Sequence, residues 1–242
     1  MAVTQVLNYH DVQLYDSDVA LFATRQWLND NAINFYLQFL THDALNGGAV
    51  ADLLLMDPAV VSCMMLQCDD DDEYEDLGRG LTLDSKRVCF IPMNDNDQFG
   101  GESTHWSLLV YRRDERTFAH YDSSSGHNAH AAKRIMAEFE KMLRLCGAVD
   151  GHAAKATFVD VRETPQQRNG YDCGMYVLVI TEYLCRKYVH EQQQQRGDGG
   201  NAEPMPSMQA FVTPERVTRT RLEMPALVQR LRREQQAAGG HR

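Results

Sequence analysis

A single cysteine, Cys173, separates a polar, turn-prone segment from a long apolar one in PQQRNGYDCGMYVLVITEYLC, residues 165–185. Asn169 and Asp172 supply turn and capping chemistry, so the pattern predicts a helix that begins near the cysteine and is buried along residues 175–184. The thiolate is the reactive form of cysteine, and a helix N-terminus beside a histidinium stabilises it. The position suits a nucleophile, although a cysteine beside an apolar run is more often a small buried hydrophobe.

A nucleophilic cysteine needs a base and a group that orients the base. Among the nine histidines, His105 opens a predicted strand after a Gly-rich segment, where its side chain can face a cleft. His120 is a rival, because it lies two residues from Asp122 on another predicted strand and shares a face with it. His127 and His130 are expected to be solvated surface residues. The spacing alone leaves the choice between His105 and His120 open.

Cysteine spacing, net charge and apolar run length indicate which kinds of metal site, cofactor and binding partner to expect. The six cysteines include no CxxC pair, and the nearest two, Cys63 and Cys68, lack a second close pair, so we expect reduced thiols, no metal and no cofactor. A net charge of -10 disfavours nucleic acid and favours a basic protein partner. The first residues do not resemble a signal peptide, and no apolar run is long enough to cross a bilayer. We therefore expect no membrane association and a cytoplasmic or nuclear location.

The elements that must position these residues follow from apolar periodicity. Helical spacing predicts a helix over residues 24–40, with Thr24 as its N-cap, and another over 129–145. Further segments are rich in β-branched and aromatic residues or alternate in polarity, and they predict strands over 86–94, 105–113, 118–123 and 157–163. The second and third strands form a hairpin across RDER. This mixture of elements favours an α+β fold over a repeated βαβ unit.

Several polar segments lie between or after the predicted helices and strands. The acidic run 69–76 is expected to be a solvated loop or a helix end. Residues 191–205 are rich in Gln and Gly and predict a flexible insertion, and the tail 237–242 should fray. Residues 213–236 predict a helix with a basic outer face and with these side chains facing inward: Leu222, Leu227, Val228 and Leu231.

Four ordered motifs carry a resemblance to a known family: WLND at 27–30, GGESTHWSLLVY at 100–111, HYDSSSG at 120–126 and PQQRNGYDCGMYV at 165–177. Together they resemble the Ulp/sentrin-specific cysteine proteases from about residue 11 to about residue 232. Within that family the likeness is greatest to the small deneddylases, which remove the neddylation modifier. The resemblance implies a papain-like α+β fold of the Ulp type, a central mixed sheet flanked by helices, with residues 1–242 as one protease domain.

The resemblance also implies roles for individual residues. It assigns four catalytic positions: His105 as general base, Asp122 as its orienting partner, Gln167 in the oxyanion hole and Cys173 as nucleophile. It assigns four further positions to the binding of a Gly-Gly tail: Trp27 and Trp106 as channel walls, with Asp30 and Asn94 holding the tail backbone. His120 becomes a strand residue beside Asp122, and residues 95–103 a mobile lid.

The implied function is a monomeric thiol protease that cleaves after the C-terminal Gly-Gly of a ubiquitin-like modifier, in its precursor and in lysine conjugates. The neddylation modifier is the expected partner, and a SUMO-specific protease is the alternative within the family. A Cys/His acyltransferase and an inactive modifier-binding module are alternatives of other classes. The presence of all four catalytic residue types counts against an inactive module.

Overall fold

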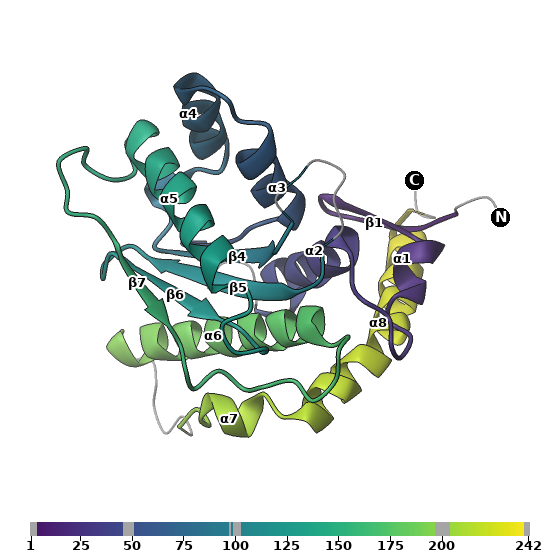
Figure 1. The fold of residues 1–242 in the computed structure, drawn as a ribbon. Helices are drawn as coiled ribbons and strands as arrows, with labels where there is room; N and C mark the ends of the chain where they lie inside the picture. Colours follow the sequence, from purple (N-terminus) through teal and green to yellow (C-terminus); the bar gives the residue numbers. More distant parts are fainter. Residues whose placement is uncertain (1–3, 46–50, 97, 99–102, 197–203, 240–242) are drawn as a thin grey trace.

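The computed structural model describes residues 4–45, 51–96, 98, 103–196 and 204–239. Over these residues a mixed five-stranded sheet has the order β3-β4-β5-β6-β7 (Figure 1). The strands are β3 (Leu53–Leu55), β4 (Val88–Asn94), β5 (Trp106–Arg112), β6 (Thr117–Tyr121) and β7 (Thr157–Asp160). The two outer pairs, β3 with β4 and β6 with β7, are parallel, and the two inner pairs are antiparallel. The predicted hairpin across RDER is confirmed as β5 and β6.

Both faces of this sheet are covered by helices, so its central strands are apolar on both sides. Cys89 and Ile91 point into the layer of α3 (Pro58–Leu66), α4 (Asp71–Gly80) and α5 (Ala129–Leu145). Val88 and Phe90, one residue out of phase, point into the opposite layer with α2 (Asp30–Phe39) and α6 (Cys173–Gln195). Figure 1 shows α3, α4 and α5 on one side of the sheet and α6 on the other. The predicted α+β class and its mixed, helix-flanked sheet are confirmed.

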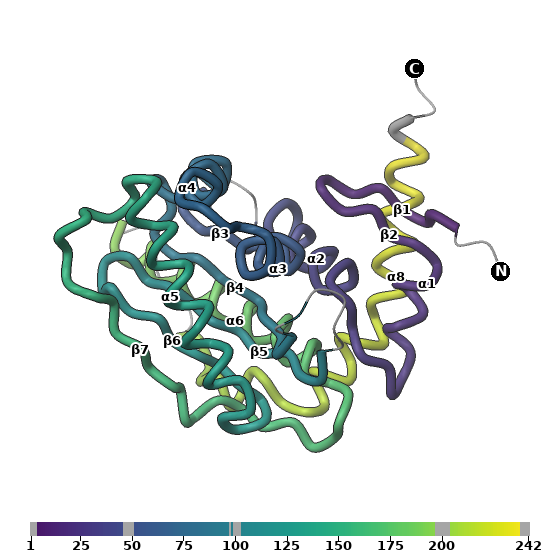
Figure 2. The backbone as a smooth tube through the Cα atoms, turned by 45° about the horizontal axis from the view of Figure 1, so that its top comes forward, coloured from purple at the N-terminus to yellow at the C-terminus, as the bar shows by residue number. Residues whose placement is uncertain are grey.

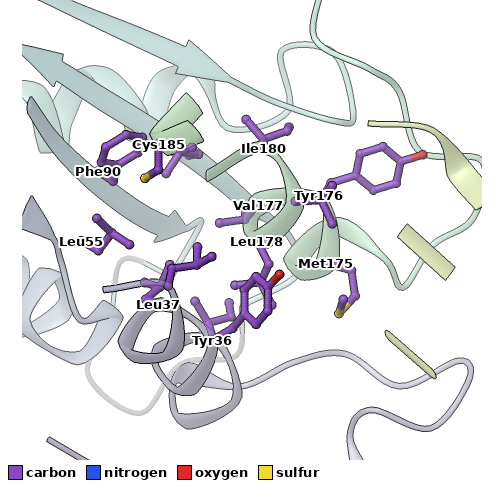
Figure 3. Close-up of a cluster of buried hydrophobic side chains, with 14 of the residues drawn as sticks. Tyr36, Leu37, Leu55, Phe90, Met175, Tyr176, Val177, Leu178, Ile180 and Cys185 are labelled. Carbon is purple, nitrogen blue, oxygen red and sulfur yellow. The ribbon is translucent and has the colours of Figure 1, made fainter. Parts of the chain in front are cut away.

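The helix α6 forms the centre of the second layer. Its first half is buried around its whole circumference, which accounts for the continuous apolar run that the sequence presents there. Figure 3 shows Met175, Val177 and Leu178 of this helix among side chains from α2, β3 and β4. Cys173 is therefore the first residue of a helix that the core holds firmly.

The two ends of the described chain pack against each other. A hairpin of β1 (Gln5–Tyr9) and β2 (Val12–Tyr15), followed by α1 (Asp16–Ala20), lies beside α8 (Pro214–Gly239), as Figure 2 shows. The short helix α7 (Met208–Phe211) precedes α8, a π-helical turn η1 (Leu40–Ala44) follows α2, and a 3-10 turn η3 (Leu83–Ser85) precedes β4. None of the described helices is both long and apolar enough to cross a membrane.

Two predicted boundaries are wrong. The helix expected from residue 24 begins at Asp30, because the side chain of Asn29, not that of Thr24, caps it by accepting from the Ala32 N–H at 2.9 Å. The segment predicted as a flexible insertion is helical in its first five residues, since α6 continues to Gln195, and residues 197–203 lie outside the described chain.

The C-terminal helix also departs from expectation. Val228 and Leu231 are buried, but Leu222 is 60% exposed. Arg221, one residue earlier, is buried instead. The helix continues to Gly239, so residues 237–239 of the predicted frayed tail are helical, and 240–242 lie outside the described residues.

The acidic run 69–76 lies mostly in the first turns of α4. The Asp70 side chain caps that helix by accepting from the Glu73 N–H at 3.0 Å. Carboxylates at this end of a helix complement its dipole, so the run has a local structural role. The alternative of a helix end is the correct one for this segment.

Candidate active site

The structure brings three of the four predicted catalytic side chains together at the start of α6. His105, just before β5, places its Nε2 atom 2.6 Å from Oδ1 of Asp122, which directly follows β6. The imidazole and the Cys173 side chain line the same cavity, and interaction with Cys173 is among the causes that raise the pKa of His105. All three side chains are buried. The structure thus gathers a thiol, an imidazole hydrogen-bonded to a carboxylate, and the start of a helix, which are the groups that nucleophilic catalysis by cysteine requires.

The surroundings favour a protonated His105. Burial acts to lower the pKa of this imidazole, but hydrogen bonds and charge interactions with Asp122 and Cys173 outweigh it and raise the pKa to about 9. At neutral pH the ring therefore carries a positive charge beside the sulfur. Cys173 is also the first residue of α6, where the backbone N–H groups have no acceptor within the helix. Both features stabilise a negative charge at the sulfur.

Asp122 is held ionised by its neighbours. Burial alone would raise its pKa, but hydrogen bonds from His105 and from the backbone N–H groups of Asn128 and Ser124 lower it. Asn128 fastens both members of the pair, because its N–H donates to Asp122 Oδ2 at 3.0 Å and its side-chain amide donates to the His105 carbonyl at 3.1 Å. The sequence reasoning missed Asn128, since an Asn before a helix reads as an ordinary cap.

His120, the rival base, lies in a different environment. Its ring is fully buried, with Nδ1 3.0 Å from Asp160 Oδ1 and Nε2 3.1 Å from the Ser107 hydroxyl. Burial lowers its pKa despite the nearby Asp160 carboxylate, so this imidazole is neutral at neutral pH. Both ring nitrogens are occupied by partners other than Cys173, which leaves His105 as the base that reaches the sulfur.

Gln167 belongs to the loop that leads into α6. Its Oε1 accepts from the Ser123 hydroxyl at 2.7 Å, and its side-chain N–H donates to the Asn169 carbonyl at 2.6 Å. Both bonds fix the orientation of the amide. A primary amide carries two N–H donors, so one remains for an oxyanion that forms near Cys173.

A cavity of about 310 Å³ opens beside Cys173. Trp27, Asp30, Trp106 and His105 line it, together with Leu28. Trp106 is buried and donates from Nε1 to the Leu28 carbonyl at 2.9 Å, whereas Trp27 is 49% exposed and donates to the Gly170 carbonyl at 2.6 Å. Three of the four residues predicted to bind a Gly-Gly tail therefore surround one cavity at the sulfur. Asn94 instead lines a neighbouring pocket on the other side of Trp106.

Two further residues, Asp95 and His127, contact His105 or its backbone, and the sequence did not predict these contacts. The Asp95 carboxylate accepts from the N–H groups of Thr104 and His105 at 2.7 and 3.0 Å, and these bonds lower its pKa against the effect of burial. His127 is exposed, as expected, with 47% of its side chain accessible; its ring also contacts that of His105, with centroids 4.8 Å apart, and lies 3.7 Å from Asp95. Residues 97 and 99–102 of the predicted lid lie outside the described residues, so the lid stays a prediction.

The described part of the chain holds no group of three or more His, Cys, Asp or Glu side chains arranged to bind a metal ion. Cys63 and Cys68 are partly buried, and Cys89 and Cys185 are buried. Burial raises the pKa of Cys89 to about 12 and that of Cys185 still further, so neither thiol is reactive at neutral pH.

Comparison with known proteins places this geometry in a family. Residues 26–211 match the model of the Ulp1 protease family, C-terminal catalytic domain. Sentrin-specific protease 8 of Homo sapiens is 33% identical over 224 residues, which cover 92% of this chain and 95% of that protein. NEDD8-specific protease 1 of Arabidopsis thaliana is 30% identical over 232 residues, which cover 95% of each chain.

Solved structures agree at the level of the fold. The C-terminal Ulp1 protease domain, crystallised in complex with Smt3, the yeast orthologue of SUMO, superposes with a TM-score of 0.66 at 19% identity, covering 96% of this chain and 89% of that one. The match of a family model to most of the chain, the relatives a third identical along nearly their whole length, and the Cys-His-Asp cluster lead to one conclusion: this chain belongs to the Ulp1 protease family.

Proposed function

We propose that this protein is a cysteine protease that hydrolyses the bond after the C-terminal Gly-Gly of a ubiquitin-like modifier, with Cys173, His105, Asp122 and Gln167 as its catalytic residues. The observation that carries the proposal is the cavity that Cys173 and His105 line together with two tryptophans, where His105 is hydrogen-bonded to Asp122. That cavity is suited to a tail without side chains.

The reaction proceeds in two steps. The Cys173 thiolate attacks the carbonyl carbon of the last glycine, and the imidazolium of His105 gives its proton to the departing amine, which leaves a thioester. His105, now neutral, then takes a proton from water, whose oxygen attacks the thioester carbonyl and releases the sulfur as a thiolate and the tail as a carboxylic acid, which loses its proton to solvent. In both steps the oxyanion receives hydrogen bonds from the free N–H of Gln167 and from the backbone at the start of α6. Asp122 keeps the imidazole in the required tautomer and stabilises its charge.

We further propose that the neddylation modifier is the preferred substrate. Support comes from relatives in Homo sapiens and Arabidopsis thaliana, whose names are sentrin-specific protease 8 and NEDD8-specific protease 1. The structure related by fold was crystallised with a SUMO orthologue, which keeps a SUMO-directed protease as the second candidate.

The test uses a panel of modifiers, NEDD8, SUMO and ubiquitin, each carrying a C-terminal electrophile. We expect the NEDD8 probe to form a covalent adduct with Cys173 fastest, and its C-terminal fluorogenic conjugate to give a kcat/KM at least about a hundredfold above that of SUMO. The variant Cys173→Ala is the matched control and should form no adduct. A faster reaction with SUMO would refute the modifier assignment, and turnover by Cys173→Ala would refute the mechanism.

A further inference from the structure

One buried arginine connects the C-terminal helix to the loop in front of Cys173. Arg221, on α8, is 1% exposed, and its Nε donates to Asp172 Oδ1 at 2.8 Å. Asp172 directly precedes Cys173 and occupies the N-cap position of α6. Nothing in the reaction just described uses Arg221, which lies outside the part of the chain that the family model matches.

The remaining donors of this guanidinium reach the same loop and one other segment of the chain. Nη1 donates to the Leu21 carbonyl at 2.8 Å and to the Ala23 carbonyl at 3.3 Å, and Nη2 donates to the Tyr171 carbonyl at 3.2 Å. Leu21 itself lines the cavity beside Cys173. Arg221 thus joins one wall of the cavity to the loop that leads into α6. Figure 2 shows how α8 runs past α1, the segment that ends just before Leu21.

The loop has a second fixed point on its opposite side. Trp27 donates to the Gly170 carbonyl, and within the loop the Asn169 side chain donates to Asp172 Oδ2 at 2.7 Å. Among the residues that the structure describes, Arg221 is the one charged hydrogen-bond partner of Asp172. Without it, an unpaired carboxylate would lie one residue from the sulfur, where it would oppose the negative charge that catalysis requires.

We propose that Arg221 is a positioning residue for the candidate reaction: it neutralises Asp172 and fixes the loop and the Leu21 wall around Cys173. The proposal rests on the proposed function in that it takes Cys173 as the nucleophile. A planar guanidinium can serve a carboxylate and three carbonyls at once, whereas a lysine supplies the same charge as a single point. Replacing Arg221 with lysine therefore keeps the positive charge but removes the planar set of N–H donors.

The experiment compares Arg221→Lys and Arg221→Met with Arg219→Met, which removes an exposed arginine two residues earlier on the same helix. Two readouts are measured at a temperature at which near-ultraviolet circular dichroism shows each variant folded. One is kcat and KM on the C-terminal fluorogenic conjugate. The other, which needs no modifier, is the rate at which iodoacetamide alkylates Cys173, followed by mass spectrometry of its peptide. The peptides of Cys63, Cys68 and Cys146 serve as internal controls.

For Arg221→Lys we expect kcat to fall about 30-fold with KM within about threefold, and Cys173 alkylation to slow about tenfold while the other cysteines react at unchanged rates. Arg219→Met should stay within about twofold of the starting protein on every readout. In the double variant Asp172→Asn/Arg221→Met, which buries neither charge, Cys173 alkylation should be at least about threefold faster than in Arg221→Met.

A folded Arg221→Lys whose kcat and Cys173 alkylation both stay within about twofold of the starting protein would overturn the proposal, as would a change confined to KM. If Arg221→Met does not fold, Arg221→Lys decides alone, because it keeps the buried charge. Failure of the mechanism itself has a different signature, namely turnover by Cys173→Ala.

Discussion

Replacing Asp122 with Asn should move the alkaline limit of activity to lower pH. His105 has a pKa of about 9, so its proton, which the leaving amine needs, is present below that pH and is lost as the pH rises through it. The Asp122 carboxylate, 2.6 Å from Nε2, gives the largest of the interactions that raise this pKa. In Asp122→Asn the charge is gone while the size of the side chain is kept.

The magnitude follows from the shift. A pKa that rises from 6.5 to about 9 corresponds to roughly 3 kcal/mol of net preference for the charged ring, and this net value already includes the opposing effect of burial. We assign at least half of it to Asp122, so the alkaline limb of kcat/KM should move to lower pH by about 1.2 units or more. An Asn amide can also present its N–H to the ring and favour the wrong tautomer, so kcat/KM at neutral pH should drop at least about a hundredfold.

The assay is the pH profile of kcat/KM with the fluorogenic conjugate, because this parameter reports the ionisation of the free enzyme. Asp160→Asn is the matched control, since Asp160 stands in the same relation to the rival His120, with Oδ1 3.0 Å from its ring. We expect the control to keep its alkaline limb. An unchanged limb in Asp122→Asn, or an equal shift in both variants, would refute the assignment of His105 as the proton donor.

Three further changes test the rest of the site. His105→Ala should lower kcat/KM by more than about a thousandfold, whereas His120→Ala should mainly lower the urea midpoint, and the opposite ranking would exchange their roles. Gln167→Ala should lower kcat by about a hundredfold with little change in KM, because its contact strengthens as the oxyanion forms, and an unchanged kcat would remove it from the mechanism. Asn128→Ala removes the donor to the His105 carbonyl, so we expect a loss of about 1–3 kcal/mol in the free energy of unfolding together with a kcat about tenfold lower. Full activity in a destabilised Asn128→Ala would limit Asn128 to a structural role.

Local chemistry made much of the site predictable. The turn residues before Cys173 and the apolar run after it set the start of α6, and the β-rich composition of β4, β5 and β6 predicted the strands whose ends hold His105 and Asp122. The choice between His105 and His120 did not follow from spacing. It depends on which ring reaches the sulfur, and that is fixed by tertiary contacts such as those of His120 with Ser107 and Asp160.

The errors have a common physical origin in long-range packing. Helical periodicity alone assigned Leu222 to the core, but α8 turns Arg221 inward, because a buried carboxylate and three carbonyls there require a cation. The start of α2 depends on the Asn29 cap, which competes with an equally plausible Thr24 in the sequence. His127 is the surface residue that the sequence predicts, and only its ring contact with His105 depends on the fold.

The pairing of Arg221 with Asp172 and Leu21 also joins segments that are synthesised at very different times. Arg221 lies 200 residues after Leu21 and 49 after Asp172, so these bonds cannot form until the C-terminal helix has left the ribosome. A nascent chain that has emerged only as far as Gln195 already contains Cys173, His105, Asp122 and Gln167, yet its Asp172 carboxylate has no cation. Under the proposal that Arg221 positions the loop, the surroundings of Cys173 are incomplete until α8 has been synthesised and has packed.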